Sequence, residues 1–152
     1  MYTTQCLLAF VALYVRLAHS WEFAVSVEDR LEFYINDTKT DTVHLDSEKP
    51  SALAYDEVHD ILLYVDKQSG NDAICGYNIS FAEHKCYMQR SGRDIQGLAF
   101  DPITQYLFFT DTKEKSINWI SFQPGSKNNV NGNLLIKMDE GIPTDITVDS
   151  CR

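Results

Sequence analysis

Apolar and polar positions alternate in short runs along most of the chain, and the pattern recurs at a fixed interval. The segments 51–67 and 96–112 superimpose after a shift of 45 residues, with leucine, alanine and aspartate at coincident positions. In the first segment two apolar runs each end at an aspartate, Asp56 and Asp66. Short apolar runs bounded by turn residues predict buried strands, and a fixed period predicts a repeat architecture.

Each copy of the repeat predicts four strands. The first copy covers 49–93 and the second covers 94–141, and neither shows a sustained helical period. The expected strands contain the sequences LAY, LLYV, AICGYNIS and KCYMQR in the first copy, and LAF, YLFFT, SINWISF and LLIKM in the second. Four short strands in a unit of this length are the signature of a β-propeller blade. The sequence therefore predicts an all-β fold.

Two flanking segments match only part of a blade. Residues 21–48 contain FAVSV, RLEFYI and DTVHL, which predict three strands without an innermost one. Residues 142–152 begin a third copy at an offset of 48 residues, and we expect them to form its first strand. The predicted organisation is three outer strands, two full blades and the start of another.

Aspartates and aromatic residues mark equivalent points of the repeats. The aromatic positions are expected in the core between blades, and the aspartates are expected to accept hydrogen bonds from backbone amides at strand ends. These structural repeat positions are Asp56, Asp66, Asp101, Asp111, Asp149, Tyr64 and Phe109.

Composition narrows the class of protein. The chain has 152 residues, is 44% hydrophobic and carries a formal net charge of −9. It can bury a core, and its acidity disfavours binding to nucleic acid or to anionic membranes. The same charge would favour a basic protein ligand.

The first twenty residues predict a signal peptide. An apolar stretch at 7–15 precedes the small-x-small sequence at 18–20, which is typical of a cleavage site. The stretch is too short to cross a bilayer, and a buried strand or an N-terminal anchor helix is the alternative. We therefore expect a secreted chain that begins near Trp21.

Two further patterns are informative if the chain is secreted, because glycosylation and disulfide formation occur in the secretory route. Asn36 and Asn78 each begin a glycosylation sequon. Cys75 and Cys86 can bridge two strands of one hairpin, which would leave Cys151 without an obvious partner. Three separate buried thiols are the alternative.

Several motifs resemble those of a known family. The sequences LYVD at 63–66 and FFTD at 108–111 resemble the YWTD motif of LDL-receptor class B repeats, although Tyr64 and Phe109 stand where that family usually has tryptophan. Within this class the chain is most similar to the cueball family of insect membrane proteins. The segments 21–25 and 148–152 are the features behind that choice.

The resemblance implies a partial six-bladed propeller. Residues 21–48 would supply the outer strands of the closing blade, and a complete ring needs roughly 250 residues at this repeat length. We therefore expect a fragment of a longer receptor or the product of a truncated gene model. The family further implies EGF-like modules, one membrane span, a cell-membrane ectodomain, a role in sperm and egg development, and help from a propeller-specific endoplasmic-reticulum chaperone.

Three functions are compatible with these features. A ligand-binding or protein-binding receptor segment is favoured, and a secreted metal-dependent propeller hydrolase or an inactive structural fragment are the alternatives. The equivalent aspartates follow the repeat, whereas a catalytic set would more often break it. His44, His59 and His84 lack the spacing of a zinc site. We therefore predict no catalytic residue, metal or cofactor.

Overall fold

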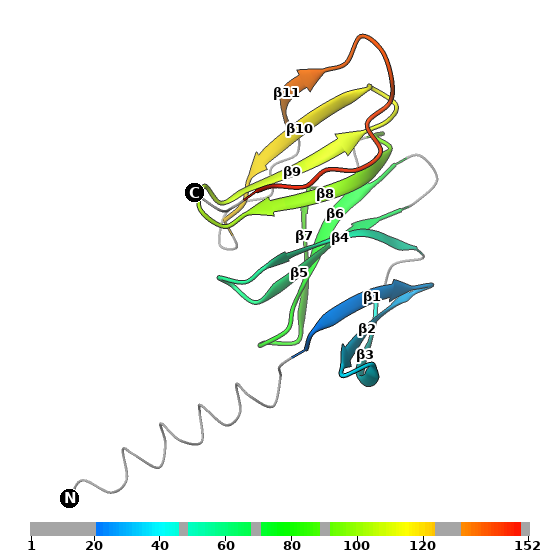
Figure 1. Cartoon of the computed structure of the whole chain (residues 1–152), viewed down its shortest axis with the longest axis vertical. Coiled ribbons are helices and arrows are strands. Elements are labelled where there is room, and N and C mark those ends of the chain that lie inside the picture. The colour runs from blue at the N-terminus through cyan, green and yellow to red at the C-terminus, as the bar shows by residue number, and fades with distance from the viewer. Residues whose placement is uncertain (1–20, 46–48, 68–70, 89–91, 124–131, 150–152) are drawn as a thin grey trace, which may run out of the picture.

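Three antiparallel sheets, stacked side by side, make up most of the part of the chain that the structure describes (Figure 1). The computed structural model describes residues 21–45, 49–67, 71–88, 92–123 and 132–149, and this part holds eleven strands and no helix. None of its elements is a helix that could cross a bilayer. The first sheet comprises β1 (Phe23–Val27), β2 (Arg30–Ile35) and β3 (Thr38–His44). The second comprises β4 (Pro50–Asp56), β5 (Ile61–Asp66), β6 (Ala73–Asn78) and β7 (Glu83–Met88), and the third comprises β8 (Ile95–Asp101), β9 (Tyr106–Asp111), β10 (Ser116–Ser121) and β11 (Asn133–Lys137).

The second and third sheets repeat one another in their strand order and in their first turns. The β4–β5 hairpin pairs Asp56 with Ile61, and the β8–β9 hairpin pairs Asp101 with Tyr106. The residue that ends each turn has a positive φ, 57° at Asp60 and 56° at Gln105. Equivalent positions thus adopt the same unusual backbone conformation, as expected of two copies of one blade.

The core lies between the sheets, so the central one is buried on both faces. All six residues of β5 are buried. Leu62 and Tyr64 pack toward the first sheet, whereas Leu63 and Val65 pack toward the third. The period of two in a strand sends successive side chains to opposite faces, which gives one strand two separate cores.

Cys75 and Cys86 form a disulfide that links β6 to β7. The two residues are direct partners in the register of these strands. The predicted signal peptide at 1–20 and Cys151 lie outside the described residues.

Residues 142–149 differ from the expected first strand of a third copy. They lie beside β8 but are not assigned to a strand (Figure 1). A Cβ atom on Gly97 would lie 2.8 Å from the Cα of Asp145, so the two backbones are very close there. The first strand of each complete blade pairs with its second strand, whereas residues 142–149 take part in no strand pairing among the described residues.

The first sheet carries a buried carboxylate on the face turned away from the second sheet. Glu32 accepts hydrogen bonds from Arg30 Nε at 2.8 Å and from the Tyr34 hydroxyl at 2.7 Å. Lys39 Nζ lies 3.3 Å from the same carboxylate. The bond from Arg30, followed by that from Tyr34, lowers the pKa of Glu32 to about 2.

Acid is therefore expected to destabilise the fold through Glu32. A carboxyl whose pKa is lowered by folding stabilises the native state above its unfolded pKa, which is 4.5 for glutamate, and this contribution is lost as the pH falls toward 2. Urea unfolding between pH 5 and pH 2.5 should show a smaller loss of stability for Glu32→Gln than for the wild type. Glu140→Gln, an exposed site, should follow the wild type. Identical pH profiles for Glu32→Gln and the wild type would contradict this role.

Candidate functional site

The repeated aspartates after β4 and β8 hold the first turn of each blade. Asp56 Oδ1 accepts hydrogen bonds from the backbone amides of Val58 and His59 at 3.0 and 3.2 Å. Asp101 Oδ1 accepts a bond from the amide of Ile103 at 2.9 Å. Side-chain acceptors of this kind replace a backbone partner in a turn.

The second carboxylate oxygen of each turn aspartate contacts the side chain three residues further on, which is the same position in both blades. Asp56 Oδ2 lies 2.6 Å from His59 Nδ1, and Asp101 Oδ2 accepts a hydrogen bond from Thr104 Oγ1 at 2.7 Å. Because Asp56 and Asp101 are both buried, these contacts occupy their carboxylates inside the turns.

Asp111 has the corresponding role after β9. Its Oδ1 accepts hydrogen bonds from the backbone amides of Lys113 and Glu114 at 3.1 and 3.2 Å. Its Oδ2 forms an ion pair with Arg93 Nη1 at 3.0 Å, and its side chain is fully buried. Asp66, which ends β5, is buried as well.

The remaining repeat positions divide into buried and exposed ones. Tyr64 lies in the core between the first and second sheets, and Phe109 lies in the core between the second and third. Arg93 lies over the ring of Phe109, 5.5 Å from its centroid. Asp149 is exposed in the segment beside β8.

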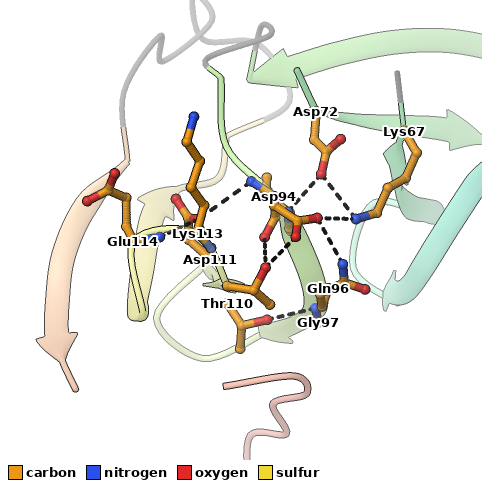
Figure 2. A network of polar contacts seen from close by, with 11 residues as sticks. Lys67, Asp72, Asp94, Gln96, Gly97, Thr110, Asp111, Lys113 and Glu114 are labelled. Atoms are coloured by element: carbon orange, nitrogen blue, oxygen red, sulfur yellow. Dashed lines mark hydrogen bonds and ion pairs between the residues drawn. The ribbon is translucent and has the colours of Figure 1, made fainter. Parts of the chain in front are cut away.

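A polar network joins the second sheet to the third (Figure 2). Lys67 Nζ donates to Asp94 Oδ1 at 2.7 Å and lies 3.3 Å from Asp72 Oδ2. Asp72 Oδ2 also accepts a hydrogen bond from the amide of Ile95 at 2.7 Å. The bond from Lys67 is the largest cause that lowers the pKa of Asp94, followed by the bond from the Thr112 hydroxyl.

This network was missed at the level of sequence, although the repeat contains a signal for it. Lys67 is equivalent to Thr112, and Lys49 is equivalent to Asp94. The backbone bonds match, because Lys67 N donates to Lys49 O and Thr112 N donates to Asp94 O. In the third sheet the Thr112 side chain bonds to Asp94 of its own blade. The equivalent residue of the second sheet is Lys67, and its longer, charged side chain forms an ion pair with Asp94 of the next blade instead.

The histidines do not converge on one point. His59 contacts Asp56, the ring of His84 lies 4.8 Å from that of Tyr77, and His44 is exposed. Within the described ranges, no three His, Cys, Asp or Glu side chains are grouped as metal ligands would be.

Apolar side chains are exposed at the end of the blades that lies away from the Lys67–Asp94 network. Val58 and Ile103 occupy equivalent positions in the β4–β5 and β8–β9 turns, and both are exposed. Phe81 lies in the β6–β7 turn and is 74% exposed. Strand direction places these three turns at the same end of the sheets, next to the exposed Glu57. Exposed apolar side chains at one end of the sheets are available for contact with a partner.

No protein-family model matches the sequence. Comparison with curated proteins finds the Protein cueball of Drosophila virilis, 30% identical over 140 residues, which are 88% of this chain and 22% of that protein. The cueball proteins of Drosophila persimilis and Drosophila ananassae are 30% and 25% identical, each over 87% of this chain. The chain thus spans about a fifth of the length of these relatives.

Solved structures share the fold at lower identity. The structure of a nidogen/laminin complex matches with a TM-score of 0.70 and 16% identity, over 84% of this chain and 48% of that chain. A luciferin-regenerating enzyme matches with a TM-score of 0.63 and 14% identity, again over 84% of this chain and 48% of that chain.

Fold and site together define part of a YWTD-type β-propeller, which confirms the predicted fold class. Within this class the chain is similar to the cueball proteins, and the predicted resemblance to that family is confirmed as well.

Proposed function

We propose that the chain is a protein-binding propeller segment from the extracellular part of a cueball-like, single-pass receptor. The observation that carries this proposal is the repeated turn, which exposes Val58 and Ile103 at equivalent points of two blades. A solved structure with the same fold is that of a complex between two proteins, nidogen and laminin. A rigid sheet scaffold that presents short loops is well suited to hold such a partner.

The partner is proposed to be basic. Glu57 is exposed in the β4–β5 turn beside Val58, and the chain has a net charge of −9. Complementary charge increases the rate of encounter and selects between partners.

A cell-binding experiment tests the proposed face. We expect the labelled, secreted chain to bind saturably to ovary or testis cells, and the double variant Val58→Gln and Ile103→Gln to lose about tenfold in affinity or more, because uncharged polar side chains replace the apolar contacts. Leu135→Gln makes the same kind of change at an exposed position on β11, away from these turns. Equal binding by the double variant and by Leu135→Gln would overturn the proposed face.

The two sequons lie at equivalent turns of neighbouring sheets. Asn36 is exposed in the β2–β3 turn, and Asn78 ends β6 at the β6–β7 turn. Asn78 Nδ2 donates to His59 O at 3.1 Å, and its Oδ1 accepts a bond from the amide of Phe81 at 2.9 Å. Glycans on both would lie at the edge of the proposed face.

Glycosylation at these sites is a separate prediction. The chain secreted from insect cells should shift in gel mobility after treatment with an N-glycosidase. Thr38→Ala and Ser80→Ala, which destroy the sequons but keep the asparagines, should each remove one step of that shift. Asn133→Gln, outside any sequon, should leave it unchanged. A chain that secretes normally with no shift would contradict the prediction.

Signal-peptide cleavage near Trp21, a cell-membrane location, a germline role and a dedicated endoplasmic-reticulum chaperone form the wider proposal. They are supported by similarity to the cueball proteins and by the sequence pattern at 1–20. N-terminal sequencing of the secreted chain tests the first of them directly, and an unprocessed N-terminus would contradict it.

An enzymatic function is the second candidate, because a luciferin-regenerating enzyme shares the fold. It predicts hydrolysis of lactones or esters that a chelator abolishes. The binding proposal predicts no such chelator-sensitive activity, so one assay on the secreted chain separates the two.

A further inference from the structure

A small cleft opens between the first and second sheets, at the outer side of the blades. Its volume is about 230 Å³, and its walls include Trp21, Phe33, Thr40, Asp41, Tyr77 and Ile79. Both sheets that form the cleft belong to this chain, and the core between them holds its walls in place.

Three aromatic rings line the cleft, and packing holds them in place. Phe33 and Tyr77 are buried, with 4% and 9% of their surfaces exposed. The Trp21 ring meets that of Phe33 edge-on at 5.7 Å and that of Tyr55 at 4.7 Å. Such contacts fix an indole that the end of the first sheet would otherwise leave mobile.

The cleft has an acidic wall. Asp41 is exposed on β3, and its carboxylate forms no ion pair with any described side chain. Asp41 is itself one of the walls of the cleft. Burial, followed by the field of Asp41, raises the pKa of the Tyr77 phenol on the opposite wall. Aromatic faces beside a carboxylate attract cations.

The strand that carries Asp41 also has a free edge. In the described part of the chain β3 pairs with β2 alone and is the outermost strand of its sheet. Phe33 and Asp41 are register partners, and the register shifts beside them, so both Thr40 and Asp41 reach the cleft from this edge. An extended segment that pairs with such an edge places every second side chain on one side.

We propose that this cleft holds an arginine or lysine side chain of an extended partner segment that pairs along β3. The inference rests on the proposed binding function, and it specifies that the partner has a cationic side chain where it meets the cleft. The net charge of −9 would draw such a segment toward the chain.

Fluorescence of Trp21 measures the interaction. The sequence has two tryptophans, and the variant Trp119→Phe leaves Trp21 as the single reporter. The probe is an acetylated and amidated pentapeptide with a central arginine between threonines. Its partner probe carries citrulline, which has a similar shape and no charge. We expect a saturable change with the arginine peptide and about tenfold weaker binding of the citrulline peptide.

Matched variants locate the site. Asp41→Asn should weaken the arginine peptide about fivefold, whereas Asp37→Asn, in the same hairpin but outside the cleft walls, should leave the affinity unchanged. Near-UV circular dichroism confirms that each variant is folded. Equal binding of the two peptides, or equal effects of the two variants, would overturn the inference.

Two further outcomes separate this inference from others. If free arginine or tetramethylammonium binds as tightly as the peptide, the cleft is a small-cation site and the partner segment is refuted. If Asp41→Asn keeps full peptide affinity and cell binding while the Val58 and Ile103 double variant loses cell binding, the cleft inference fails and the proposed function stands.

Discussion

Replacing Phe109 with alanine is expected to lower the free energy of unfolding by about 3–5 kcal/mol. Phe109 is fully buried between the second and third sheets, and its ring also supports Arg93. The change leaves a cavity at the contact between two blades. Because small domains are stable by only about 5–15 kcal/mol, this variant should be close to unfolding under mild conditions.

The control for this prediction is the same substitution at an exposed ring. Phe81 is 74% exposed, so Phe81→Ala should change stability by less than about 0.5 kcal/mol. Urea unfolding followed by far-UV circular dichroism measures both. Equal midpoints for the two variants would show that Phe109 does not lie in a core.

Replacing Asp111 with alanine should lower the free energy of unfolding by about 2–4 kcal/mol. One buried carboxylate both accepts the hydrogen bonds of the turn after β9 and forms an ion pair with the residue before β8. Its loss leaves the amides of Lys113 and Glu114 without their acceptor. It also leaves Arg93, whose side chain is only 19% exposed, without its ion-pair partner.

Asparagine at the same position separates the two roles. Asp111→Asn keeps an oxygen for the turn amides but removes the charge that faces Arg93, so we expect it to recover about half of the loss. Urea unfolding of the two variants and the wild type gives the comparison. If asparagine is as damaging as alanine, the turn bonds contribute nothing; if it equals the wild type, the ion pair contributes nothing.

The repeated parts of the fold could be predicted from sequence because they depend on local pattern. A strand needs only an alternating or continuous apolar run, and a turn aspartate bonds to amides two or three residues away. The predicted burial of Tyr64 and Phe109 between sheets follows from the same pattern, since an aromatic at the same place in two copies has the same surroundings.

The contacts between blades depend on geometry that sequence spacing does not contain. Lys67 reaches Asp94 only because stacking brings the end of β5 beside the start of β8. The cleft likewise requires both Trp21, which precedes the first sheet, and Tyr77 of the second sheet. The first strand expected after residue 141 is likewise not found among the described residues, because 142–149 run beside β8 without strand pairing.

The central claim is that like sheets stack and bury one another's faces, and contacts between ring protons test it most directly. The centroids of Tyr87 in the second sheet and Phe122 after β10 lie 4.5 Å apart, and those of Trp21 and Tyr55 lie 4.7 Å apart. Nuclear Overhauser spectroscopy of the secreted chain should show cross-peaks for both pairs. Resolved signals from all four rings without either cross-peak would contradict the stacked-blade account.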